Sequence, residues 1–219
     1  DSTAGAHPLN HSDMKAPTLD DARATLRKAF GYPAFRAGQE IAVESVLLGR
    51  DTLVILPTGG GKSLCYQVPA LLLPGLTVVV SPLISLMKDQ VDALEAKGIA
   101  AAFVNSTLTN GQVSDRMARV ARGELKMLYM APERFDAGST AEQLRRAGVS
   151  LLAIDEAHCI SQWGHDFRPS YLRMRAVREA LGDPPTIALT ATATPTVRRD
   201  IARQLALRDP RVVITGFDR

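Results

Sequence analysis

A predicted strand that runs directly into a glycine-rich turn and a Lys-Ser pair is the feature that most constrains this chain. Residues 53–57 are apolar and predict a buried strand, and the next stretch reads Thr58-Gly59-Gly60-Gly61-Lys62-Ser63. Glycines let backbone N–H groups turn inward around an anion, and a helix that opens after them adds its positive end. Lys62 can reach the β- and γ-phosphates of a nucleotide, and the Ser63 hydroxyl can bind Mg²⁺. The stretch therefore predicts a phosphate-binding loop.

One residue of this loop departs from the general pattern, because Leu56 stands where a phosphate-binding loop usually begins with Gly. The order of strand, turn and helix is otherwise as the pattern requires. The alternative is a plain glycine-rich turn beside a surface lysine.

Apolar runs alternate with helical patterns along the whole chain. We expect strands at 52–56, 76–81, 100–105, 126–130, 151–155, 186–191 and 211–214. We expect helices near 19–30, 38–48, 62–73, 83–97, 110–122, 141–147, 170–181 and 196–206. Several strands are apolar on both faces, which is typical of a parallel sheet covered by helices on both sides. The pattern predicts one α/β domain over residues 18–219, with a doubly wound, mostly parallel sheet flanked by helices. We expect residues 1–17 to be a flexible leader or a cloning remnant.

Composition limits the class of protein. The net charge is +3 and the pI about 9.0, which permits a polyanionic partner without requiring one. Apolar runs all fall short of the roughly 20 residues that span a bilayer, and residues 1–13 lack the basic start and apolar core of a signal peptide. Cys65 and Cys159 fall inside predicted elements, so we expect reduced, half-buried thiols in a cytoplasmic protein. We expect no membrane partner.

An acidic motif closes the strand predicted at 151–155, which runs into Asp155-Glu156-Ala157-His158. A strand-terminal aspartate beside a phosphate-binding loop supplies the Mg²⁺ contact that phosphoryl transfer needs, and the next glutamate can act as general base on the attacking water. Two alternatives remain. The carboxylates could simply be solvated, or His158 could bind a metal with Cys159 and His165, although this spacing matches no ordinary zinc motif.

A loop with aromatic residues follows at 160–169 and holds the single tryptophan of the chain, Trp163, with Phe167 and Arg168. Aromatic side chains beside an ATPase site can stack on nucleobases, and arginine can hold a phosphate. The alternative is a loop that Trp163 and Phe167 pin to the core. Because every motif follows a strand, we expect all of them to converge at one edge of the sheet.

Seven segments in a fixed order resemble the first RecA-like motor domain of RecQ-family DNA helicases, within the DEAH-type superfamily-2 helicases. The resemblance covers residues 19 to 219. It rests on the glycine loop, the D-E-A-H motif, the aromatic loop and residues 30–39, 81–90, 129–134 and 189–193. The aromatic loop in particular is similar to RecQ proteins and unlike other DEAH proteins.

The resemblance implies a role for each matching residue. Gln39 would read the adenine edge while Tyr32 and Arg36 stack on the ring; the family usually has Pro where this chain has Ala37. His158 would join Lys62, Asp155 and Glu156 in the catalytic group, with Ser63 and Asp155 on Mg²⁺. The residues implied in DNA contact or coupling are Ser81, Lys88, Asn105, Gln162, Trp163, Phe167, Arg168, Thr190 and Thr192. The alternative for 190–193 is a strand end built of small residues.

The resemblance also implies an activity, an ATP-dependent 3′-to-5′ DNA helicase of DNA repair and recombination. Its cofactors would be ATP and Mg²⁺, and its partners single-stranded DNA, duplex junctions and a second RecA-like domain of the same full-length chain. The isolated fragment would be poorly active, and the protein would act in the cytoplasm, at the nucleoid of a bacterium. Alternatives are an RNA-directed DEAH-type ATPase, a non-catalytic nucleotide-dependent binding module and a small-molecule kinase.

Overall fold

The computed structural model describes residues 15–59, 61–136 and 138–216, and within them seven strands form one sheet. The order across the sheet is β3-β4-β2-β5-β6-β1-β7, and every neighbouring pair is parallel. The strands are β1 (Thr52–Ile55), β2 (Leu76–Val80), β3 (Ala101–Val104), β4 (Met127–Met130), β5 (Val149–Ile154), β6 (Thr186–Thr190) and β7 (Arg211–Ile214). The predicted parallel α/β sheet is confirmed.

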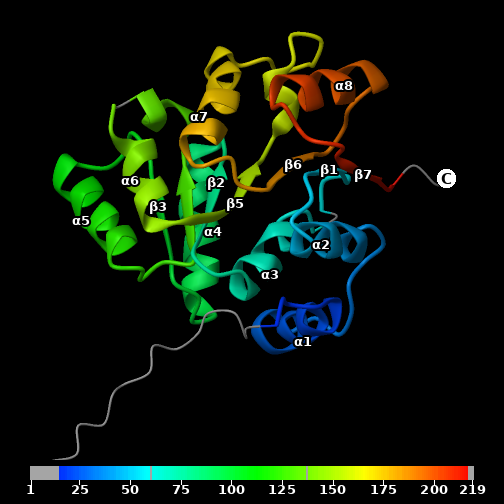
Figure 1. The fold of residues 1–219 in the computed structure, drawn as a ribbon, viewed down its shortest axis with the longest axis horizontal. Coiled ribbons are helices and arrows are strands. Elements are labelled where there is room, and N and C mark those ends of the chain that lie inside the picture. The colour runs from blue at the N-terminus through cyan, green and yellow to red at the C-terminus, as the bar shows by residue number, and fades with distance from the viewer. Residues whose placement is uncertain (1–14, 60, 137, 217–219) are drawn as a thin grey trace, which may run out of the picture.

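Helices cover both faces of this sheet (Figure 1). Side chains alternate between the faces along each strand, so Val54 of β1 packs into one apolar cluster while its neighbours Leu53 and Ile55 pack into the other. The first cluster is built with α1 (Leu19–Phe30), α2 (Gln39–Leu47), α3 (Leu64–Leu72) and α4 (Ile84–Ala96). The second is built with α5 (Asn110–Ala121), α6 (Thr140–Ala147), α7 (Met174–Ala180) and α8 (Pro195–Gln204). The sheet is therefore doubly wound.

The predicted elements agree with the observed ones to within three residues at almost every boundary. The exceptions are short 3₁₀ helices, which have no apolar period to reveal them. Ala157–Ile160 begins inside the acidic motif, directly after Glu156, and Pro132–Asp136 follows β4. The helix predicted at 170–181 begins as the 3₁₀ helix Pro169–Arg173 and becomes α7 only at Met174.

The carboxyl ends of parallel strands lie at one edge of the sheet, and the predicted motifs meet there. Strands β5, β6 and β1 are consecutive neighbours in the sheet. The acidic motif follows β5, residues 190–193 follow β6, and the glycine loop follows β1. The topology therefore brings three segments that are far apart in the sequence to one place.

The opposite edge holds a buried ion pair. Arg178 of α7 donates two hydrogen bonds to the carboxylate of Asp51, which precedes β1, at 2.8 and 2.9 Å. Asp51 also accepts from the backbone N–H groups of Thr186 and Arg208. One carboxylate thus joins the starts of β1 and β6 to α7 and to the segment before β7. No helix in the described residues is long and apolar enough to cross a membrane.

Candidate functional site

The glycine loop lies directly after β1, and its lysine folds back over the strand end. The Lys62 Nζ donates to the carbonyl oxygen of Leu56 at 3.3 Å. Gly59 and Gly61 have φ of 81° and 73°, a conformation that residues with a Cβ rarely adopt. Gly60, predicted as part of this loop, lies outside the described residues.

Helix α3 begins at Leu64, two residues after the predicted start. The backbone N–H groups of Leu64 and Cys65 donate to the carbonyls of Gly61 and Lys62, three residues back, so Lys62 and Ser63 form a turn that leads into the helix. Both side chains are partly buried, and Thr58 is exposed at the mouth of the loop. The local order of strand, glycine turn and helix is as the sequence predicts.

Gln39 connects the N-terminal helices to the glycine loop. It is 1% exposed, its Oε1 accepts from the Arg36 backbone N–H at 2.7 Å, and its Nε2 donates to the Gly61 carbonyl at 3.0 Å. A Cβ on Gly61 would lie 2.3 Å from the Gln39 Nε2, so only glycine permits this contact. Arg36 is exposed and donates from its guanidinium to the Gly59 carbonyl at 2.7 Å, and Tyr32 is 49% exposed. Two of the three predicted base-contacting residues, Gln39 and Arg36, therefore contact the loop.

The acidic pair at the end of β5 is held in a strained, poorly solvated position. Burial, and next the charge of Glu156, raise the pKa of Asp155 to about 6, while the nearby Lys62 charge acts in the opposite direction. Asp155 Oδ1 accepts from the Glu156 backbone N–H at 2.9 Å. Glu156 has a φ of 51°, which is uncommon for a residue with a side chain and is typical of functional sites. The site thus holds a carboxylate that a cation would stabilise.

A short chain of polar contacts runs from Glu156 to the end of β6. The His158 Nδ1 lies 3.5 Å from a Glu156 carboxylate oxygen and 2.8 Å from the Thr190 Oγ1. The Thr190 hydroxyl donates to the carbonyl of Thr192 at 3.1 Å, so its oxygen accepts the proton of His158 Nδ1. Burial lowers the pKa of His158. The neutral imidazole thus links the acidic motif to residues 190–193.

The loop from residue 161 to residue 168 is fixed by its backbone, and the alternative in which Trp163 pins the loop to the core is excluded. Trp163 is 72% exposed. Instead, a Cβ on Gly164 would lie 2.9 Å from the His158 carbonyl oxygen, and the Arg168 N–H donates to the Cys159 carbonyl at 2.8 Å. These backbone contacts leave the indole facing solvent.

A cleft of about 380 Å³ lies between this loop, the segment after β6 and α8. It is mainly apolar, and Trp163, His158 and Thr192 contribute to its walls. Gln162 is exposed beside it, and Phe167 and Arg168 are partly buried. A flat apolar ligand with a polar edge would fit such walls.

Three more residues predicted for DNA contact, Ser81, Lys88 and Asn105, differ in exposure. Lys88 is exposed on α4 and pairs with Asp92. The side chains of Ser81 and Asn105 are 6% and 1% exposed, because each accepts hydrogen bonds from the backbone of its own turn.

Contacts at the acidic motif include residues that the sequence reasoning missed or misjudged. The His165 ring stacks on His158 with centroids 4.5 Å apart, and the Tyr171 hydroxyl donates to the Asp155 carbonyl at 2.9 Å. The residue that joins His158 and Cys159 in a group of possible metal ligands is Asp166, whereas the metal-binding alternative considered from the sequence had His165 in that place. Both cysteines are free and fully buried, against the expected half-burial. Loop packing decided these contacts, and no sequence period reports it.

Comparison with known proteins shows which family this chain belongs to. The DEAD/DEAH box helicase family matches residues 36–200. The ATP-dependent DNA helicase RecQ of Bacillus subtilis is 52% identical over 203 residues, which cover 92% of this chain and 34% of that protein. The ATP-dependent helicase wrn-1 of Caenorhabditis elegans is 46% identical and covers 98% of this chain and 20% of that protein. The chain thus spans about a third of the length of its bacterial relatives, and the resemblance to RecQ helicases is confirmed.

Solved structures agree on the fold at low sequence identity. The DEAD-box helicase Mss116 bound to single-stranded RNA has a TM-score of 0.70 at 15% identity, and the alignment covers 94% of this chain and 46% of that one. The DUF1998 helicase MrfA bound to DNA has a TM-score of 0.70 at 17% identity, covering 95% of this chain and 30% of that one. The predicted RecA-like architecture is therefore confirmed.

Proposed function

The chain belongs to the DEAD/DEAH box helicase family, and on that premise we propose that it is the first motor domain of an ATP-dependent, 3′-to-5′ DNA helicase. Its role would be to bind Mg–ATP at the glycine loop and to contact single-stranded DNA beside it, in DNA repair and recombination. The domain would comprise residues 18–219 and would act in the cytoplasm. The RecQ relatives support DNA as the nucleic acid.

The nucleotide residues divide into three groups by what they can offer. Gln39 and Arg36 contact the loop and would hold the base together with the exposed Tyr32. The loop from Thr58 to Ser63 would surround the phosphates, and ATP would draw the Lys62 ammonium away from the Leu56 carbonyl, a contact that at 3.3 Å is weak. Residues that fit Mg²⁺ are Ser63 and Asp155, because a hydroxyl and a carboxylate are ligands that this ion prefers.

Glu156 would act as the general base on the attacking water. Its left-handed backbone conformation places the carboxylate at the strand end, next to Asp155, and a carboxylate oxygen lies 3.5 Å from the His158 Nδ1. Because the imidazole is hydrogen-bonded to Thr190, a change at the catalytic carboxylate reaches residues 190–193 through two contacts. This contact chain, which ends beside the cleft under Trp163, is the observation that carries the proposal.

A second RecA-like domain of the full-length protein would complete the nucleotide site. Such a domain would face the glycine loop and supply an arginine to the developing phosphate charge, a group worth about 10³–10⁵ in rate in related enzymes. The isolated chain would therefore bind nucleotide, hydrolyse it slowly and fail to unwind a duplex.

The test is steady-state ATP hydrolysis by the full-length protein with single-stranded DNA, with single-stranded RNA and with neither. We expect DNA to stimulate hydrolysis at least tenfold more than RNA. Equal or stronger stimulation by RNA would favour the RNA-directed DEAH-type ATPase, and hydrolysis indifferent to both would contradict a nucleic-acid motor. Glu156→Gln serves as the matched control, because it keeps the size of the side chain and removes the base.

A further inference from the structure

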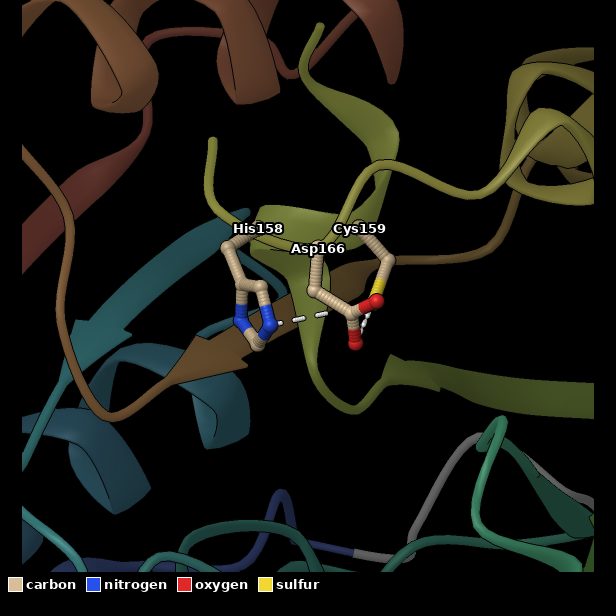
Figure 2. A group of neighbouring side chains, drawn as sticks. All are labelled: His158, Cys159 and Asp166. Carbon is tan, nitrogen blue, oxygen red and sulfur yellow. Dashed lines mark hydrogen bonds between the residues drawn. The ribbon is translucent and has the colours of Figure 1, made fainter. Parts of the chain in front are cut away.

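Three side chains of different chemistry meet behind the acidic motif. His158 and Cys159 belong to the 3₁₀ helix Ala157–Ile160, and Asp166 comes from the loop that folds back on it. Figure 2 shows the three pointing toward one another from these two segments. One ligand atom from each, a ring nitrogen, a sulfur and a carboxylate oxygen, lie within 4.8 Å of one another.

The distances match those between ligands of one tetrahedral ion. The Cys159 Sγ lies 3.7 Å from the His158 Nε2 and 3.8 Å from the Asp166 Oδ2. With Zn–S bonds of about 2.3 Å and Zn–N or Zn–O bonds of about 2.0–2.1 Å, sulfur and a lighter ligand on a tetrahedron are about 3.5 Å apart. Shifts of a few tenths of an ångström would bring the sulfur to this distance from each of the other two atoms, and the nitrogen and oxygen, which lie within 4.8 Å of each other, would move together onto the same ion.

The hydrogen bonds of the histidine leave the correct nitrogen facing this group. Because the Thr190 hydroxyl donates to the Thr192 carbonyl, it accepts from His158 Nδ1–H. The lone pair of the neutral ring then lies on Nε2, toward the Cys159 sulfur. Fixing a histidine through its other nitrogen is the usual support of a metal-binding imidazole.

We propose that His158, Cys159 and Asp166 form a binding site for a divalent transition-metal ion, with Zn²⁺ as the best fit. Nitrogen, thiolate and carboxylate are the ligand types that zinc takes, and three protein ligands leave the fourth position for water. The ion replaces the Cys159 thiol proton, which passes to solvent. Asp166 is exposed, which gives the ion a path to the site.

A bound ion would join the 3₁₀ helix to the returning end of the loop. Asp166 already pairs with Arg168 at 3.3 Å, and this ion pair holds the carboxylate near the Cys159 sulfur. The ion would fix the loop on both sides of Trp163 and Gly164 by a bond stronger than these hydrogen bonds. Metal binding at this group does not depend on the proposed helicase function.

Cobalt titration of the metal-free chain tests the site, because a cysteine thiolate bound to Co²⁺ gives a strong near-ultraviolet absorption that nitrogen and oxygen ligands do not. We expect this band to saturate at one Co²⁺ per chain and to disappear on addition of Zn²⁺, which binds such ligands more tightly than cobalt. His7 and His11 lie outside the described residues and could hold cobalt, but without sulfur they would not produce the band.

The variants assign the band to its ligands. Cys159→Ser should abolish it, and Asp166→Asn, a change to one exposed side chain, should weaken cobalt affinity by at least about tenfold. The matched control is Cys65→Ala, which removes the other cysteine and should keep the band. Absence of the band in the native chain, its survival in Cys159→Ser, unchanged affinity in Asp166→Asn or its loss in Cys65→Ala would each overturn the proposal.

Discussion

Two aspartates at opposite edges of the sheet have opposite surroundings, one buried and paired and the other partly buried and poorly solvated. At the amino-terminal edge, Asp51 accepts hydrogen bonds from Arg178 and from two backbone N–H groups, so its charge is fully compensated. At the carboxyl-terminal edge, Asp155 accepts one from Glu156, and burial raises its pKa to about 6. The first edge is satisfied within the chain, whereas the second is left short of a cation that a ligand can bring. The ion pair that stabilises the fold and the proposed nucleotide site thus lie at opposite edges of the sheet.

The largest effect should come from breaking the compensated edge. Arg178→Ala leaves the Asp51 charge buried without its main partner, and we expect the free energy of unfolding to fall by about 3–5 kcal/mol. Urea denaturation measures it. The matched control is Arg50→Ala, because Arg50 pairs with Asp209 at the surface, where an ion pair contributes at most about 1 kcal/mol. Similar losses in both variants would contradict the contrast.

The next effect belongs to the carboxyl-terminal edge and concerns rate. Lys62→Ala should slow ATP hydrolysis by the full-length protein about 10²–10³-fold, the effect of losing one charged contact in the transition state. Stability should change little, because the amine makes one long hydrogen bond to Leu56. Steady-state hydrolysis and a thermal melt, run side by side, measure both. A rate within threefold of the native protein would remove Lys62 from its proposed role.

Asp155→Asn should stabilise the nucleotide-free chain by about 3 kcal/mol at pH 7.5, since the pKa rises from 3.8 to about 6 and each unit corresponds to about 1.4 kcal/mol. The pKa of Asp155 in the folded chain lies above its ordinary value of 3.8, so the folded chain binds more protons between about pH 4 and pH 6. Stability therefore falls as the pH rises through this window, and the penalty is complete above it.

Urea denaturation of the native and Asp155→Asn chains between pH 3.5 and pH 8 measures this dependence. The gain should vanish near pH 3.5, where the native carboxyl is protonated in both states. A gain of the same size at every pH would mean that the substitution acts through packing and not through charge.

The smallest effect on stability should come from the most exposed aromatic residue. Trp163→Ala should change the free energy of unfolding of this chain by less than about 0.5 kcal/mol, because the side chain is 72% exposed and the loop is fixed by its backbone. In the full-length protein it should remove most of the DNA stimulation of ATP hydrolysis and leave the basal rate. A clear loss of stability would restore the anchoring role that the structure contradicts.

The sequence was sufficient for the sheet because long apolar runs and glycine turns carry their own signal. Strand β5 and the acidic motif after it could be placed without coordinates, as could the glycine loop after β1. Short 3₁₀ helices carry no such period, so the turn of Ala157–Ile160 was missed. The contact of Asp166 with Cys159 was missed because it depends on how the loop folds back, which no sequence period reports.

The sequence also did not predict which side chains of the loops are exposed. An aromatic residue in a loop can face the core or solvent, and here Trp163 faces solvent while the next residue, Gly164, packs closely against the His158 carbonyl. Asn105 shows the reverse case, since a polar residue predicted at a surface strip is buried by the hydrogen bonds of its own turn.

The separation of the two edges is tested most directly by thermal melts of this chain with and without Mg–ATP. A ligand that binds only the folded state stabilises it by RT ln(1 + [L]/Kd) and so raises the melting temperature. We expect Mg–ATP to stabilise the native chain and Arg178→Lys by the same free energy, although the variant starts from a lower melting temperature, and to leave Lys62→Ala unmoved. A native chain that Mg–ATP does not stabilise, or a Lys62→Ala chain stabilised as much as the native one, would contradict the account.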